Sequence, residues 1–192
     1  MPHLILASQS PRRRELLDQI GIRYTVQAAD LDETPLLNEM PLAYVTRIAT
    51  EKSAWVQSRN TSHLPILAAD TTVVCDGMIL GKPEDEADAV KMLLQLSGRT
   101  HQVYTSVSLR VATEHWHTLS ITEVTFRQLT MTEIIAYWKT GEPVDKAGSY
   151  AIQGLGGVFV AAIQGSFSGV VGLPIFETAS LLERVGIKIG HD

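Results

Sequence analysis

Short apolar runs and amphipathic helical repeats alternate along the chain, and turn residues mark most of their borders. The apolar runs predict strands over 3–7, 24–28, 65–74, 100–112, 117–126 and 158–163. Apolar positions at helical spacing predict helices over 11–20, 41–58, 84–96, 130–141 and 174–185. Asp76-Gly77 predicts a hairpin turn, a second turn is expected near Glu114-His115, and residues 165–172 are expected to form a loop.

These elements mix irregularly, so the pattern predicts an α/β fold with a mixed sheet rather than strict βαβ winding. The Gly-rich stretch 145–157 matches neither a helix nor a strand. The sequence shows no internal repeat and no linker long enough to divide the 192 residues. We therefore expect a single domain over residues 1–192.

Composition narrows the class of protein. A net charge of −5 argues against broad binding to nucleic acid or to an anionic membrane. No apolar run approaches the length of a membrane span, and the first apolar run is too short for a signal peptide. The single cysteine, Cys75, fits a reducing compartment. A cytoplasmic enzyme or binding protein is the expectation.

Three consecutive arginines begin the first predicted helix. Ser10 is placed to cap that helix and Pro11 to occupy its first turn. Cations are unfavourable at this positive end of the helix dipole unless an anion binds there. The helical phase turns Arg12 and Arg13 toward the protein and Arg14 toward water. The stretch indicates an anion site, although a basic surface turn is the simpler alternative.

Lys52 falls at the centre of an apolar stripe in the predicted helix 41–58. Lysine is rarely buried without a partner, and a phosphate would serve as one. The alternative is a lysine whose stem is buried while its ammonium reaches water.

Asp70 interrupts the apolar strand 65–74. A carboxylate in such a strand is costly unless it is paired or bound to a metal. It is either a structural acid with buried hydrogen bonds or a general base or metal ligand.

The remaining candidates are Lys82 after the first hairpin and Glu33 in the acidic loop 30–38. The sequence has no P-loop, no Gly-x-Ser-x-Gly motif and no histidine pair with metal-ligand spacing, and its Gly-Leu-Gly-Gly stretch lacks a dinucleotide fingerprint. Several cations beside two carboxylates suit a polyphosphate and a divalent ion. The residues alone therefore indicate a metal-assisted phosphoanhydride hydrolase or a nucleotide-binding protein.

Several of these stretches are similar to the motifs of a known family. The matching stretches are Leu-Ala-Ser-Gln-Ser-Pro-Arg-Arg from residue 6, the Glu33 loop, Glu51-Lys52, Ala69-Asp70-Thr71, Gly81-Lys82-Pro83 and Asp145-Lys-Ala-Gly-Ser-Tyr-Ala-Ile-Gln-Gly. Together they resemble the Maf family of nucleoside triphosphate pyrophosphatases, over residues 4 to about 184. The Ala-Ile-Gln-Gly stretch looks like the branch that acts on dTTP and UTP, rather than the branch that acts on 7-methyl-GTP.

The resemblance implies an elongated mixed sheet flanked by helices, with two lobes around a central cleft, similar to inosine triphosphatases. It also implies hydrolysis of a nucleoside triphosphate to the monophosphate and pyrophosphate, a divalent cation (Mg²⁺ or Mn²⁺) and a homodimer. A regulator of cell division that binds nucleotide without essential turnover is the alternative.

Residue roles follow from the same resemblance. Asp70 matches the proton acceptor. Arg12, Thr71 and Gln153 match positions that set base specificity. Phosphate contacts are implied for Ser8, Arg13, Lys52 and Lys82, and metal binding is implied for Asp70 and Glu33. The amide of Gln153 offers both a donor and an acceptor, which suits the carbonyl and N3–H of thymine or uracil.

Overall fold

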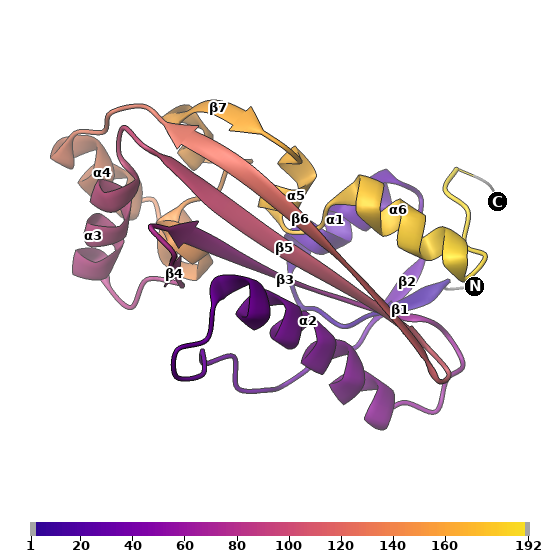
Figure 1. Ribbon diagram of the computed structural model, residues 1–192. Coiled ribbons are helices and arrows are strands. Elements are labelled where there is room, and N and C mark those ends of the chain that lie inside the picture. Colours follow the sequence, from indigo (N-terminus) through magenta and orange to yellow (C-terminus); the bar gives the residue numbers. More distant parts are fainter. Residues whose placement is uncertain (1–2, 191–192) are drawn as a thin grey trace.

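The computed structural model describes residues 3–190 and contains a seven-stranded mixed sheet within that range (Figure 1). The strands are β1 (Leu4–Leu6), β2 (Tyr24–Val26), β3 (Ile66–Cys75), β4 (Met78–Leu80), β5 (Thr100–Val111), β6 (Glu114–Phe126) and β7 (Val160–Gln164). Their order is β2-β1-β3-β5-β6-β7, with β4 paired to β3 beside this path. β1 runs parallel to β2 and β3, and the remaining pairs are antiparallel. The expected elongated mixed sheet is confirmed.

Helices cover both faces of this sheet. They are α1 (Pro11–Gln19), α2 (Pro41–Ser58), α3 (Glu86–Leu96), α4 (Met131–Trp138), α5 (Phe167–Val171) and α6 (Ile175–Arg184), with 3₁₀ turns η1 (Glu142–Asp145), η2 (Ala147–Ser149) and η3 (Leu155–Phe159). Figure 1 shows α2 along one side of the long β5–β6 hairpin and α1 and α6 on the other. The described residues contain no helix that is long and apolar enough to cross a membrane.

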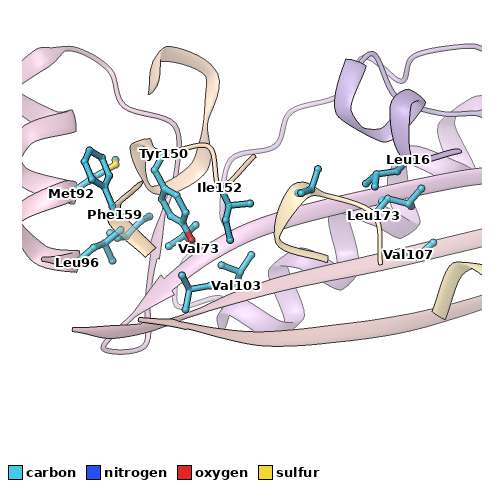
Figure 2. Close-up of a cluster of buried hydrophobic side chains, with 14 of the residues drawn as sticks. Leu16, Val73, Met92, Leu96, Val103, Val107, Tyr150, Ile152, Phe159 and Leu173 are labelled. Atoms are coloured by element: carbon cyan, nitrogen blue, oxygen red, sulfur yellow. The ribbon is translucent and has the colours of Figure 1, made fainter. Parts of the chain in front are cut away.

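The central strand β3 explains how two cores form. Its side chains alternate between faces, so Leu67 and Ala69 join the larger core while Ile66 and Ala68 join a smaller one beneath α2. Figure 2 shows the larger core extending along the sheet, from Leu16 and Leu173 at one end to groups such as Phe159 at the other. Asp70 follows on the α2 side and Thr71 on the opposite side.

Two turns were predicted with different success. Asp76 and Gly77 both adopt positive φ, at 51° and 75°, as a tight two-residue hairpin turn requires. The second hairpin turns at residues 112–113, next to the expected Glu114, but β6 already begins at Glu114, so the expected start of this strand at 117 was wrong. Glu114 and His115 pair with β5 instead.

The expected loop over 165–172 was also wrong, because α5 occupies most of it. The hydroxyl of Ser166 accepts a hydrogen bond from the Gly169 N–H (3.0 Å) and caps this helix. A helix of five residues is too short to display an apolar repeat, and the pattern therefore did not reveal it.

Candidate active site

One cavity of about 1230 Å³ opens beside the middle of β3. Every candidate residue from the sequence lines it: Ser8, Arg12, Arg13, Glu33, Lys52, Asp70, Thr71, Lys82 and Gln153. They come from the start of α1, the loop before α2, α2 itself, β3, the segment after β4 and the loop after η2. The fold therefore brings together positions up to 145 residues apart.

An ion-pair group of Lys52, Asp70 and Glu33 lies in the lining of the cavity. The Lys52 ammonium lies 2.8 Å from Asp70 Oδ1 and 2.9 Å from Glu33 Oε1. Lys52 is 8% exposed and Asp70 5% exposed, so both are largely shielded from water. The apolar stripe had indicated a partner for Lys52, and the structure supplies two carboxylates where a phosphate was expected.

Burial raises the pKa of the Asp70 carboxyl above its ordinary value, although the charges of Lys52 and Arg13 oppose the rise. A carboxylate with a raised pKa is a better proton acceptor than one in water. Its position on the cavity wall leaves it within reach of a ligand. The site thus contains a candidate general base.

Arg13 connects three separate segments on the other side of β3. Its Nε donates to the Gly172 carbonyl (2.8 Å), Nη1 to Ser8 Oγ (3.1 Å) and Nη2 to Thr71 Oγ1 (3.3 Å). Arg14 is exposed, as the helical phase predicted. The guanidinium is fixed before any ligand arrives, which lowers the entropy cost of binding an anion.

The hydroxyls around Arg13 form a chain with a defined direction. Thr105 Oγ1 donates its hydrogen to the Gly169 carbonyl (2.7 Å), so it accepts from Thr71 at 2.9 Å. Thr71 and Thr105 lie directly opposite each other in the sheet. This chain fixes the Thr71 hydroxyl against Arg13.

The start of α1 differs from the expected arrangement, in which the Ser10 side chain caps the helix. Ser10 occupies the N-cap position, but its side chain makes no capping bond. Its N–H donates instead to Ser8 Oγ (3.2 Å), which also accepts from Arg13. The Ser8 hydroxyl therefore keeps its hydrogen for donation to a ligand.

The remaining candidates surround the cavity at its rim. Arg12 lies 3.9 Å from Asp145, and Lys146 pairs with the same carboxylate. Gln153 is exposed and lies 3.4 Å from Glu15, and Lys82 is exposed. Fewer contacts hold these side chains than hold Arg13 and Lys52.

The residues that anchor the acidic loop were missed in the sequence. Arg47 on α2 donates to both oxygens of Glu39, at 2.6 and 2.7 Å, and holds the pKa of that carboxyl near 2. The Tyr44 hydroxyl donates to the Glu33 carbonyl (3.0 Å). Only the Arg47–Glu51 pair, with its spacing of four residues, carried a readable signal.

The donor set limits the kind of metal that fits. Within residues 3–190, no three His, Cys, Asp or Glu side chains gather as a metal cluster. Asp70 and Glu33 are two carboxylates in one cavity with room for a polyphosphate. Mg²⁺ commonly binds one or two carboxylates together with substrate phosphates. The residues therefore fit an ion that binds with a phosphate ligand rather than one enclosed by protein alone.

The sequence of the chain matches a known protein family over most of its length. The sequence profile described as "Maf-like protein" matches residues 3–185. The chain belongs to the Maf family. Two relatives described as "dTTP/UTP pyrophosphatase", from Methylococcus capsulatus and Myxococcus xanthus, are 54% and 56% identical to this chain. Their alignments cover 96% and 97% of this chain, and 91% and 94% of the relatives.

A further relative from Haemophilus ducreyi, described as "Nucleoside triphosphate pyrophosphatase", is 50% identical over 97% of this Maf chain and 96% of its own. Among solved structures, a Mycobacterium abscessus protein described as nucleoside-triphosphatase / dITP/XTP pyrophosphatase aligns with 94% of this chain and 93% of its own. The identity is 13% and the TM-score 0.47, a likeness too distant to add to the argument.

Proposed function

We propose that this chain hydrolyses dTTP and UTP to the nucleoside monophosphate and pyrophosphate. The observation that carries the proposal is the cavity, whose lining combines five cationic side chains with a buried carboxylate, Asp70, that has a raised pKa. The printed activities of relatives at 54% and 56% identity favour the same reaction and the same two substrates.

Phosphate binding falls to two groups that the fold already holds in place, and to two further lysines. The Arg13 guanidinium and the Ser8 hydroxyl lie at the start of α1, where backbone N–H groups also favour an anion. Lys52 and the exposed Lys82 supply two further charges for the rest of a triphosphate. Cations positioned along the triphosphate stabilise the negative charge that grows on a departing pyrophosphate.

The reaction itself needs one proton acceptor. A water oxygen attacks the α-phosphorus, its proton passes to the Asp70 carboxylate, and the bond from the α-phosphorus to the bridging oxygen breaks. Pyrophosphate leaves with that electron pair. The raised pKa of Asp70 makes it a better acceptor for this proton than an ordinary carboxylate.

Base recognition falls to the rim. Gln153 can present an acceptor to N3–H and a donor to a carbonyl of thymine or uracil. Arg12 lies on the same cavity wall and is held loosely by Asp145. A site that bonds this edge penalises bases that lack it.

The proposal has three further parts, which rest on the family and on composition. Asp70 and Glu33 would hold a Mg²⁺ or Mn²⁺ ion, which neutralises phosphate charge when bound. A homodimer would be visible as twice the chain mass in light scattering. A cytoplasmic location is consistent with the buried free thiol of Cys75, and cell fractionation tests it.

A nucleotide panel with pyrophosphate detection tests the function. We expect dTTP and UTP to be hydrolysed faster than purine triphosphates. Asp70→Asn should lower kcat by about 10²–10⁴-fold, which is the usual contribution of a general base. No release by the wild-type protein, or equal release by both, contradicts the proposal. Tight nucleotide binding without turnover would instead support the cell-division regulator.

A further inference from the structure

The Gly-rich loop that carries Gln153 is fixed from outside the cavity by two side chains. Glu142 Oε1 accepts from the Gly156 N–H (3.0 Å), and Oε2 accepts from the Leu155 N–H (2.9 Å). The Tyr137 hydroxyl donates to Glu142 Oε1 (2.6 Å) and accepts from the Ala151 N–H (3.0 Å). Three backbone amides on both sides of Gln153 are thus bound by one pair of residues.

Close approach of this pair explains the glycines of the loop. A Cβ at Gly154 would lie 2.3 Å from a Glu142 oxygen, and one at Gly156 would lie 2.6 Å from the Tyr137 hydroxyl. Neither contact is possible for a larger residue without displacing the carboxylate or the phenol. The Gly-Leu-Gly-Gly stretch is therefore a docking surface for Glu142 and Tyr137 rather than a phosphate-binding loop.

The pair is itself rigid. Tyr137 is 5% exposed and packs edge-on against Phe159, with ring centroids 4.9 Å apart. Burial alone would raise the pKa of the Glu142 carboxyl, but the hydrogen bonds from Tyr137 and the two amides outweigh it and lower that pKa. Glu142 therefore stays ionised at neutral pH and keeps its full capacity to accept hydrogen bonds.

Glu142 also begins the short turn that leads to the other rim residue. η1 runs from Glu142 to Asp145, and Asp145 lies 3.9 Å from Arg12. One four-residue turn thus fixes the Gln153 loop at its first residue and faces Arg12 at its last. The two side chains assigned to base recognition are connected through it.

We propose that Glu142, supported by Tyr137, is a specificity-positioning residue that holds Gln153 where it can read the base of the substrate. This proposal rests on the proposed function. Glu142 does not line the cavity and touches neither substrate nor reacting atoms; it acts through the loop. Its loss should impair base discrimination and leave phosphate chemistry intact.

Glu142→Gln keeps the shape of the side chain but turns an NH₂ group toward a backbone donor. We expect the ratio of kcat/KM for dTTP to that for dCTP to fall by about tenfold, because one charge-assisted hydrogen bond that holds the loop is lost and an NH₂ group faces a backbone N–H in its place. The fall should come from a higher KM for dTTP, with the slow hydrolysis of dCTP unchanged. Glu133→Gln is the matched control, since this carboxylate caps α4 and binds Arg127 without touching the loop.

A double-mutant cycle separates positioning from a general loss of stability. If Glu142 acts through Gln153, Glu142→Gln should change the ratio little in a Gln153→Ala background. Additive effects, or a normal ratio in Glu142→Gln alone, overturn the inference. Tyr137→Phe carries the same test if Glu142→Gln does not fold. A wild-type protein without preference for dTTP contradicts the proposed function itself, whereas a preference lost only in Gln153→Ala contradicts this inference alone.

Discussion

Asp70→Asn should separate activity from stability, and the structure allows the size of both effects to be worked out. If Asp70 were a structural acid, removal of one partner from a buried ion pair would cost about 3–5 kcal/mol of unfolding free energy. Here the lost charge is compensated locally, because Lys52 keeps Glu33 at 2.9 Å and the asparagine oxygen can still accept from it. The change in unfolding free energy should therefore stay within about 1 kcal/mol.

The raised pKa of Asp70 also predicts the direction in which the stability difference between the two proteins changes with pH. Because the pKa of Asp70 is raised in the folded protein, the folded state binds this proton more tightly than the unfolded chain. Stability from this group is present at low pH and is lost as the pH rises through the folded pKa. Asparagine cannot ionise, so the variant should gain stability relative to wild type as the pH rises from acidic to neutral.

Urea unfolding of both proteins at acidic and neutral pH, alongside pyrophosphate release, measures these effects. The expected result is a nearly inactive variant whose midpoint at neutral pH equals or exceeds that of the wild type. A loss of several kcal/mol at neutral pH, with activity falling only as the protein unfolds, would instead identify Asp70 as a structural acid.

Three further outcomes are expected. Lys52→Met removes a positive charge that lowers the pKa of Asp70, so the acid limb of the pH profile of kcat/KM should move to higher pH. If this limb does not move, Lys52 does not tune the pKa of the catalytic base. Arg13→Gln should raise KM for dTTP at least about tenfold, because a charge-assisted contact with phosphate is lost. Arg14→Gln is the control and should leave KM within about twofold. Similar effects of the two substitutions would contradict a phosphate-binding role for Arg13. Chelation with EDTA should stop pyrophosphate release, and added Mg²⁺ or Mn²⁺ should restore it. Turnover that persists in EDTA would exclude a requirement for a divalent metal.

Local patterns predicted much of this architecture. Arg13 and Arg14 diverge as the helical phase requires, and Lys52 in an apolar stripe signalled a buried partner. The short helix α5 lacks enough residues for a repeat and was missed. The sequence could not show that Lys52 pairs with Asp70 and Glu33, because β3 and the acidic loop reach it only through the tertiary fold.

Long-range contacts were invisible for the same reason. Arg13 is fixed by the Gly172 carbonyl, which lies 159 residues away. The glycines after Gln153 signalled a close approach, but nothing in the pattern named Glu142 as the group that approaches. The residue types indicated which chemical groups the site contains. Only the fold showed which of these groups are held rigidly and which residues hold them.

In the proposed reaction, water attacks the α-phosphorus of a pyrimidine nucleoside triphosphate in this cavity. Hydrolysis of dTTP in ¹⁸O-labelled water, followed by mass spectrometry of the products, tests it most directly. The expected products are dTMP carrying one ¹⁸O atom and unlabelled pyrophosphate. Label in pyrophosphate, or products of dTDP and inorganic phosphate, would place the attack elsewhere and contradict it.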